Sequence, residues 1–383
     1  DSFYAASMSA DMDNTDKLIR LKEDCIDAEF NIQILGPCIN HSDFNFIAEE
    51  PGKIRYALGA IKGIGKLVAE SIENERKTNG RYRNLFDFTK RLHEAKISKR
   101  TLESLIKSGA LDCLDENRAT LMNSIKLGLN YSNRVTMEEQ TGQSNLFYSE
   151  TNIEESEPKL EIRREWSLEE LLHQEYQSLG FYFSGHPFDP YRNDSKHMTK
   201  SSLSTLKKMM DSDKNNNGYN NESNIEIAGL IMEPKRRGAN LVFKIEDGTA
   251  VLDAIVFGEK RESFGELIQG QKILHLKGKL RFDRFADLWQ FVAEEAIDLE
   301  EFIQKKARTL MIKCDPRFNP EKLKKLLESH TPGKCKIKLN YKNDVEEIKL
   351  NFGDQWTVNP SKQLRDLLTA ELGIDNFQFL TRN

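Results

Sequence analysis

The spacing of hydrophobic residues changes along the chain, and the change divides it into regions. In the first half, segments such as 118–130 and 160–180 place apolar residues three or four positions apart, as in a helix with one buried face. From about residue 225, apolar and polar residues alternate as in strands. After residue 304 both spacings occur. The pattern predicts a multi-domain α+β chain.

The alternating region, 225–303, contains five or so predicted strands, with one helical stretch, ESFGELI, between the third and fourth. This order of elements is the one that an oligonucleotide-binding (OB-fold) β-barrel requires. A polar, asparagine-rich stretch, 211–223, precedes it and is typical of a linker. We therefore expect an OB-fold domain here.

OB-fold barrels hold single strands through basic loops and stacking aromatic rings. The basic candidates lie in a predicted turn before Gly238 and are Lys235, Arg236 and Arg237. A merely solvated turn is the alternative interpretation. The aromatic candidates are Phe243, Phe257, Phe282, Phe285 and Trp289. Strand alternation places at least half of these rings inside the barrel.

The last region, 304–383, predicts a small αβ domain. Asn319-Pro320 and Asn359-Pro360 each look like a helix N-cap followed by proline at the first helical position. Two strands, KIKLNY and VEEIKLNF, lie between these helices, and Gly373 is expected to end the second helix. Nothing in this region looks catalytic, and such a unit is usually an interaction module.

The string AIKGIGKLVAESI, in the region 51–137, predicts a helix-hairpin-helix motif. Gly63 and Gly65 allow a tight turn whose backbone N–H groups approach a ligand, and the following helix adds its positive N-terminal end. A phosphate oxygen suits that arrangement, with Lys62 and Lys66 placed to reinforce it. The alternative is a purely structural turn. The helix is expected to bury Leu67, Val68 and Ile72.

A second, weaker hairpin follows, with a helix that opens at Ile97-Ser98 and ends at Ser108-Gly109-Ala110. Tandem hairpins would hold the duplex backbone without reading bases, because phosphates carry no sequence information. The charges agree with this reading although the whole chain has a net charge of -5. Residues 52–110 carry 14 Lys and Arg against 6 Asp and Glu, whereas 138–175 carry 3 against 11.

Leu146 and Phe147 stand side by side in the polar stretch EEQTGQSNLFYSE, with no helical or strand period around them. The chain's own core does not explain two adjacent large apolar side chains in such a setting. We expect something other than the chain's own core to bury them.

The five cysteines are scattered, odd in number and never spaced C-x-x-C, which argues against a zinc site and a disulfide framework. Reduced thiols, the lack of an apolar run of about 18 residues and the lack of a signal pattern indicate a soluble cytoplasmic protein. The N-terminus DSFYAASMSADMDN has no starting Met, so we expect a piece of a longer chain.

The order of hairpins, QSNLF, barrel and αβ tail resembles the C-terminal portion of the alpha subunits of bacterial DNA polymerase III. SADMDNTDK, YALGAIKGIG, LIKSGALD, GFYFSGHPFDPY and FGDQWTVNPS carry the resemblance over essentially the whole chain. It implies that 1–50 ends the fingers, 51–137 binds duplex, and 138–224 holds the clamp-binding motif, a helical segment and a linker. It also implies a single-strand-binding barrel at 225–303 and a domain at 304–383 that docks the tau subunit of the clamp loader. The family's sliding-clamp motif maps onto Gln143, Leu146 and Phe147.

The resemblance implies that the intact subunit is a DNA-directed DNA polymerase, a nucleotidyltransferase that requires Mg²⁺. Its palm motif, Pro-Asp-x-Asp-x-Asp, does not occur in the sequence. The nearest matches, Asp11/Asp13 and Asp211/Asp213, lie in the fingers match and the polar linker, contexts that do not favour a metal site. We expect this segment alone to have no polymerase activity and no cofactor.

Two other functions remain open. NAD-dependent DNA ligases also combine hairpins with an OB-fold barrel. This sequence, however, lacks the adenylation lysine motif and the zinc cysteines of the ligases, and its domains follow a different order. A non-enzymatic scaffold is the other possibility, although joining proteins alone would need neither the hairpin glycines nor the basic turn.

Overall fold

The structure is a computed structural model of the 383-residue chain. It describes residues 1–26, 31–141, 157–199, 201–212, 224–265, 267–268, 271–283, 288–316, 318–343 and 345–381. The chain forms two compact units, Asp1–Gly185 and His186–Asn383. Gln143, Leu146, Phe147 and Phe285 lie outside the described residues.

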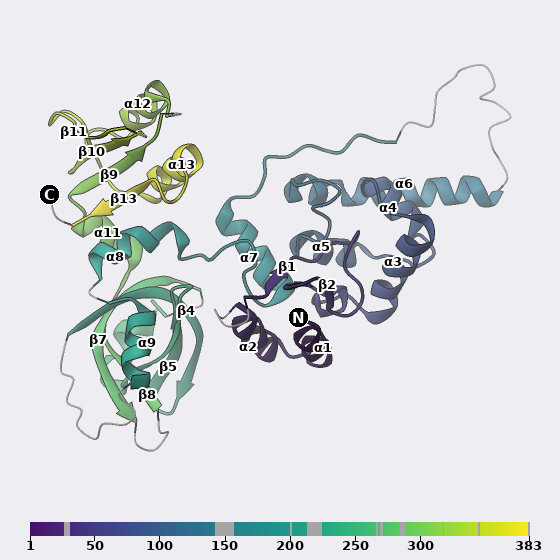
Figure 1. The fold of residues 1–383 in the computed structure, drawn as a ribbon, viewed down its shortest axis with the longest axis horizontal. Coiled ribbons are helices and arrows are strands. Elements are labelled where there is room, and N and C mark those ends of the chain that lie inside the picture. The colour runs from purple at the N-terminus through teal and green to yellow at the C-terminus, as the bar shows by residue number, and fades with distance from the viewer. Residues whose placement is uncertain are drawn as a thin grey trace. The chain divides into compact units, whose positions relative to one another are not determined.

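The first unit consists mainly of helices with one small sheet (Figure 1). The sheet has the order β1-β3-β2, with β3 parallel to β1 and antiparallel to β2. The elements are α1 (Ser2–Ala10), α2 (Thr15–Ile26), β1 (Gln33–Leu35), β2 (Ile47–Glu50), β3 (Lys53–Arg55), η1 (Leu58–Ala60), α3 (Lys66–Asn79), α4 (Leu85–Arg91), α5 (Lys99–Lys107), α6 (Arg118–Thr141) and α7 (Leu168–Leu179).

The helix expected after the glycine turn is α3. Ile72 is buried as predicted and Val68 is partly buried, but Leu67 is 82% exposed, so its expected burial is wrong. Leu67 lies in the first turn of α3, where its position on the helix faces away from the core that Ala69 and Ile72 enter. The helical region expected at 160–180 begins only at Leu168, because the Ser167 side chain caps it by accepting from the N–H of Glu170.

The predicted OB-fold is confirmed in the second unit. Five strands close into a barrel of order β4-β5-β6-β8-β7, and a helix, α10, lies between the third and fourth strands (Figure 1). Helix α9 contributes apolar side chains to the barrel core. The elements are η2 (Asp189–Tyr191), α8 (Arg192–Met198), α9 (Leu203–Ser212), β4 (Ile225–Arg237), β5 (Asn240–Glu246), β6 (Val251–Val256), η4 (Gly258–Lys260), α10 (Arg261–Gly265), β7 (Ile273–Asp283) and β8 (Leu288–Asp298).

The C-terminal αβ domain is also confirmed. Its sheet has the order β11-β10-β9-β13, with β12 paired to β10. The elements are α11 (Leu299–Lys306), β9 (Thr309–Cys314), α12 (Pro320–Glu328), β10 (Cys335–Lys342), β11 (Glu347–Asn351), β12 (Thr357–Val358), α13 (Lys362–Leu372) and β13 (Phe377–Leu380).

One of the two predicted helix starts in this domain is correct. Asn319 caps α12 by accepting from two backbone N–H groups, with Pro320 at the first helical position. Asn359 does not cap α13. Instead Ser361 accepts from the N–H of Leu364, so the helix begins two residues after the expected proline. Gly373 ends α13 at φ 85°, as expected. None of the helices in the described part of the chain is long and apolar enough to cross a membrane.

Candidate nucleic-acid interface

The turn before α3 depends on Gly63, which has a φ of +87°. A side chain is strained in that conformation, and a Cβ at this position would also meet Ser104 Oγ of α5 at 3.2 Å. Gly65 differs, because it is the N-cap of α3 with a φ of -78° and has open space around its Cβ position. Only Gly63 therefore needs to be glycine for the backbone to turn here.

Lys62 and Gly63 line a cavity of about 230 Å³ that the sequence did not predict. Helix α5 contributes two further cations and a hydroxyl to it, from Arg100, Lys107 and Ser104. The cavity is therefore lined by three cationic side chains at a glycine turn. That combination of positive charge and hydrogen-bond donors suits a phosphate oxygen. The remaining lining residues are Glu103, Gln177 and Ser178.

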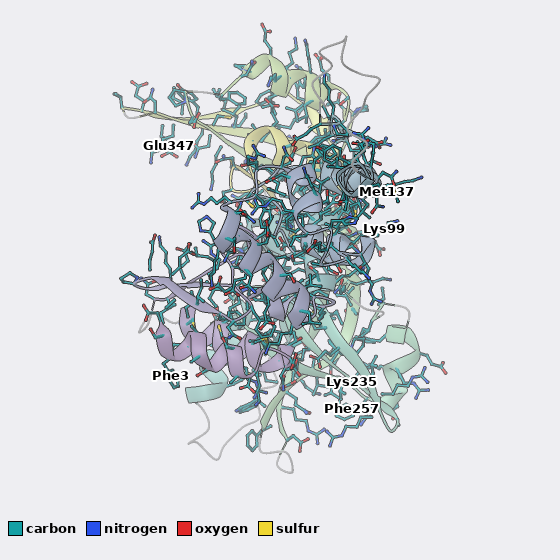
Figure 2. The ribbon with its side chains drawn as sticks, turned by 90° about the vertical axis from the view of Figure 1, so that its right-hand side faces the viewer. Phe3, Lys99, Met137, Lys235, Phe257 and Glu347 are labelled. Atoms are coloured by element: carbon teal, nitrogen blue, oxygen red, sulfur yellow. The ribbon has the colours of Figure 1, made fainter. Side chains whose placement is uncertain are left out.

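The negative charge at the cavity is already engaged. Glu103 Oε1 lies 3.6 Å from Lys99 Nζ, on the exposed first turn of α5 (Figure 2). Lys107 Nζ donates to Gln177 Oε1 at 3.4 Å, which joins α5 to α7. The cavity therefore keeps a net positive lining.

Lys66, the other predicted lysine, does not line this cavity. Its Nζ lies 3.7 Å from Glu70 Oε1 and 5.6 Å from the centroid of the Phe44 ring. The structure thus brings Lys62 and Gly63 together with α5, and places Gly65 and Lys66 on the start of α3 beside them. Lys66 is 67% exposed and accessible to a ligand along that helix start.

The hairpin is held in place by α7 of the same unit. The N–H of Lys62 donates to the carbonyl of Ser178 at 2.8 Å, so this donor is used within the fold. The second hairpin helix, α5, begins as predicted at Ser98, whose side chain accepts from the N–H of Thr101. It buries Leu102, Leu105 and Ile106, and Gly109 follows it at φ 80°.

In the barrel, the predicted basic turn is instead the end of a strand. Lys235, Arg236 and Arg237 belong to β4 and pair in register with β5, because a bulge at Glu233 lets the ladder continue after it. All three are exposed, and Gly238 makes the turn at φ 60°. Lys235 Nζ lies 3.0 Å from Glu233 Oε2, so part of its charge is compensated.

The aromatic candidates separate by burial. Phe243 is in the barrel core, and Phe282 and Trp289 pack edge to face at 5.4 Å. Phe257 is 38% exposed, and the Arg281 guanidinium lies 5.4 Å from its ring centroid. It lies at the same end of the barrel as Lys235 (Figure 2), where a Cβ at the neighbouring Gly258 would come within 3.1 Å of Ala239 in the β4–β5 turn. Phe257 is therefore the candidate ring best placed beside the basic end of β4.

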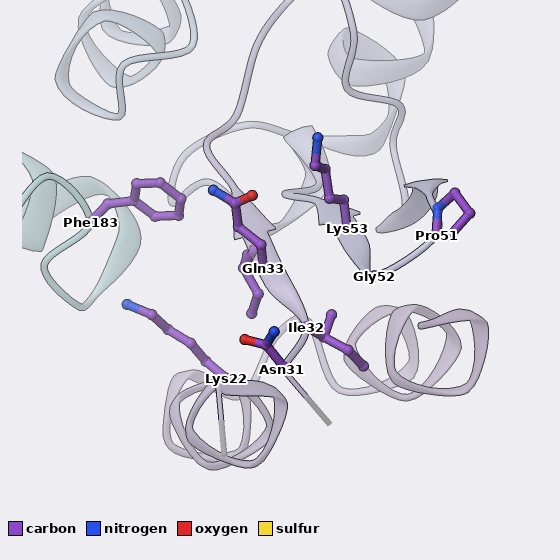
Figure 3. A pocket seen from close by; sticks show the side chains of 9 residues that line it. Lys22, Asn31, Ile32, Gln33, Pro51, Gly52, Lys53 and Phe183 are labelled. Atoms are coloured by element: carbon purple, nitrogen blue, oxygen red, sulfur yellow. The ribbon is translucent and has the colours of Figure 1, made fainter. Parts of the chain in front are cut away.

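A larger cavity of about 840 Å³ opens beside β1, and none of the predicted site residues lines it. Figure 3 shows Lys22, Gln33 and Phe183 around it, with Lys53 on its other side. Lys22 Nζ donates to the Tyr182 carbonyl at 3.1 Å and lies over two phenylalanine rings, so it holds α2 to the 181–183 segment. Within the described ranges, no cluster of three or more His, Cys, Asp or Glu could hold a metal ion.

Comparison with protein families gives two matches. The family described as "Helix-hairpin-helix motif" matches residues 31–121, which include both hairpins. The family described as "DNA polymerase III subunit alpha, C-terminal domain" matches residues 322–373. Among solved structures, the S. pombe Stn1-ten1 complex resembles 20% of this chain and 57% of its own, at 16% identity and a TM-score of 0.18.

Curated relatives match much more of the chain. DNA polymerase III subunit alpha of Xylella fastidiosa (strain 9a5c) is 35% identical over 88% of this chain and 29% of its own. The Vibrio cholerae subunit is 31% identical over 98% of this chain and 32% of its own. The chain thus spans about 30% of the length of these relatives, and the catalytic palm lies outside the matched region. Over nearly its whole length, the chain is homologous to the C-terminal part of DNA polymerase III alpha subunits.

Proposed function

We propose that this chain is the DNA-holding and clamp-tethering portion of a replicative polymerase subunit. The observation that carries the proposal is the cationic cavity at Gly63, within a matched helix-hairpin-helix motif. Phosphate oxygens of a duplex would bind there through Lys62, Arg100 and Lys107, with Lys66 beside them. Such contacts position a duplex without reading its bases.

The barrel, in this proposal, holds single-stranded template. Lys235, Arg236 and Arg237 would contact phosphates, and Phe257 with Arg281 would offer a stacking surface for a base. The exposure of these side chains and their common end of the barrel support this assignment.

The sliding clamp is the proposed partner of Gln143, Leu146 and Phe147. The two apolar side chains would fill a pocket on the clamp, which contributes roughly 1.5 to 3 kcal/mol for each one fully buried. The Gln143 amide would fix the register. One short motif binds weakly, so avidity with the DNA-binding domains would supply processivity.

The domain at 304–383 would dock the tau subunit of the clamp loader, and the intact subunit would be a cytoplasmic, Mg²⁺-dependent DNA polymerase. The homology to polymerase subunits supports both statements. The chain by itself should not extend a primer. Measurable product from the purified chain would contradict that expectation.

Fluorescence anisotropy with labelled duplex at several salt concentrations tests the DNA-binding proposal. Each phosphate contact contributes about 0.9 to the slope of log affinity against log salt, so Lys62→Gln/Lys66→Gln should flatten that slope by about 2. Lys322→Gln/Lys324→Gln on α12 removes the same charge from the other unit and should not change hairpin binding. Equal slopes for both double variants would reject the hairpin site.

Titration calorimetry with purified sliding clamp tests the tether separately. The parent should bind, and the double variant Leu146→Ala/Phe147→Ala should not, because its two alanine side chains are too small to fill an apolar pocket. Equal binding by parent and variant would assign the clamp contact to another part of the chain.

A further inference from the structure

The two faces of the C-terminal sheet differ in chemistry. Both helices, α12 and α13, pack on the face that carries the apolar residues of β9, β10 and β13 (Figure 1). The core on that side includes Leu310, Ile312, Ile337, Leu339, Phe377 and Phe379. Because side chains alternate along a strand, the intervening residues project from the opposite face.

That opposite face carries five lysines, from three neighbouring strands. We call Lys313, Lys336, Lys338, Lys342 and Lys349 the lysine face. Register places them in one plane, since Asn340 pairs with Lys313 on one side and with Lys349 on the other. Adjacent strands are about 4.8 Å apart and alternate residues on a strand about 7 Å apart, so the five lysine side chains project from closely spaced positions on one face.

Little negative charge compensates these lysines. Lys336 Nζ lies 3.0 Å from Asp354 Oδ1, and Glu347, which pairs in register with Lys342, adds one negative charge and accepts from Asn340 Nδ2 at 2.9 Å. Among the described residues, no carboxylate lies within 4.0 Å of the ammonium groups of the other four, Lys313, Lys338, Lys342 and Lys349. Residues 304–383 carry 16 Lys and Arg against 10 Asp and Glu, although the whole chain is acidic.

A groove of about 710 Å³ continues the face toward α8. It is lined by Lys338 and Met311 from the sheet and by Lys196 and His197 from α8. Glu226 also lines it, and the Lys277 ammonium, 3.9 Å from the Glu226 carboxylate, offsets part of that charge. The groove therefore extends the positive surface beyond the sheet.

We propose that the lysine face binds the phosphate backbone of DNA, as a contact separate from the hairpin and the barrel. Lysine binds phosphate as a point charge, and such binding needs no base recognition. The described residues of the face include no aromatic ring, so the stacking used by single-strand-binding barrels is absent there. The choice of DNA over an acidic polypeptide rests on the proposed DNA-holding function.

The test compares two triple variants of equal charge. Lys313→Gln/Lys338→Gln/Lys349→Gln removes three lysines from the face, and Lys322→Gln/Lys324→Gln/Lys325→Gln removes three from α12 on the other side of the sheet. Both are made in a chain that also carries Lys62→Gln/Lys66→Gln and Arg236→Gln/Arg237→Gln. The remaining affinity then reports the face, whatever the outcome for the hairpin and barrel sites.

Anisotropy with a labelled duplex and with an oligo(dT) strand, each at several salt concentrations, is the readout. The face variant should lose at least tenfold in affinity for the duplex, the oligo(dT) strand or both. Its slope of log affinity against log salt should become shallower by about 2 to 3, because each of the three lost phosphate contacts contributes about 0.7 to 0.9. The α12 variant should change neither. Circular dichroism melts should be the same for both variants.

Two results would overturn the proposal. Equal DNA affinity and salt slope for the face and α12 variants would show that the face does not contact DNA. Selective loss of binding to poly-glutamate, with DNA binding unchanged, would assign the face to an acidic protein instead. A duplex-only or oligo(dT)-only loss would support the proposal and identify which form of DNA supplies the phosphates.

Discussion

Glu175 of α7 and Arg118 of α6 form a buried ion pair, with 3.0 Å between Glu175 Oε1 and Arg118 Nη1 and side chains 1% and 7% exposed. The other carboxylate oxygen of Glu175 accepts from the N–H groups of Phe183 and Ser184. Arg118 also pairs with Asp112, 2.7 Å away. The pair therefore joins α6, α7 and the segment after α7, and α7 in turn holds the hairpin through Ser178.

Glu175→Ala should destabilise the first unit, because it leaves a buried guanidinium short of one partner. Removing one member of a buried pair costs about 3 kcal/mol or more, although Asp112 retains part of the compensation here. Hydrogen exchange of buried amides in α5 and α6 measures the loss in opening free energy. Glu170→Ala, on the exposed side of the same helix, is the control and should change it by less than about 0.5 kcal/mol. Equal protection in both variants would contradict a structural role for the pair.

Cys38 should be the thiol that alkylates first at pH 7. A hydrogen bond from Cys113 lowers the pKa of Cys38 to about 6, against the opposing effect of burial. Backbone pairing of Ile39 with Ala110 holds the two segments together. Thiolate is the reactive form, so reactivity should persist above about pH 6 and fall below it.

Iodoacetamide labelling followed by mass spectrometry measures this reactivity. Cys113→Ala should slow labelling of Cys38 at pH 7 by about tenfold, because the donor is lost and the pKa rises. Buried Cys25, Cys314 and Cys335, whose pKa values burial raises to about 11, serve as slow internal references. A labelling rate of Cys38 that does not respond to Cys113→Ala would show that the hydrogen bond does not set its pKa.

His275 should make the second unit sensitive to mild acid. Burial lowers the pKa of His275 to about 4, with the Glu226 carboxylate offsetting only part of the effect. The ring also stacks on Phe302 at 3.8 Å between centroids. Above about pH 6.5 neither folded nor unfolded histidine carries the proton. Between there and pH 4 the unfolded state binds it first, so stability falls as pH falls, by at most about 3 kcal/mol.

The comparison that isolates this effect is His275→Phe against the parent. Phenylalanine keeps a ring to stack on Phe302 but cannot be protonated, so its unfolding free energy should decline less between pH 6.5 and 4. His197→Gln, at an exposed histidine of the same unit, should decline as the parent does. Parallel curves for the parent and His275→Phe would contradict a buried neutral histidine.

Local signals in the sequence located most elements but not their partners. The Gly63 turn, the Ser98 and Asn319 caps, and the order of barrel strands follow from residues close together in the chain. The predicted helix start at Asn359-Pro360 is wrong because Ser361, directly after it, caps α13 by accepting from the N–H of Leu364. The sequence predicted a turn at Lys235 to Arg237, but β4 continues through these residues after a bulge. Such a bulge depends on how β4 pairs with β5, which the local sequence does not show.

The cavity at the hairpin shows what sequence spacing leaves out. Arg100, Ser104 and Lys107 are spaced four and three residues apart, so the sequence alone predicts that they share one face of a helix. That this face meets Gly63 depends on how α3 and α5 pack, which no local pattern encodes. The clamp motif gives the opposite case, because Gln143, Leu146 and Phe147 lie outside the described residues and their role rests on the sequence.

The measurement that tests the central claim most directly is duplex binding by Gly63→Ala beside Gly80→Ala. Both glycines have a positive φ, +87° and +80°, so alanine strains the backbone at each. Gly80 follows the far end of α3, and only the Cβ at Gly63 would also meet Ser104 Oγ, at 3.2 Å. If the Gly63 turn holds phosphate, Gly63→Ala should lose about tenfold in affinity, equally on duplexes of different sequence, as for one charge-assisted hydrogen bond. Gly80→Ala should bind as the parent does. Unchanged binding by Gly63→Ala, or an equal loss in both variants, would contradict the account.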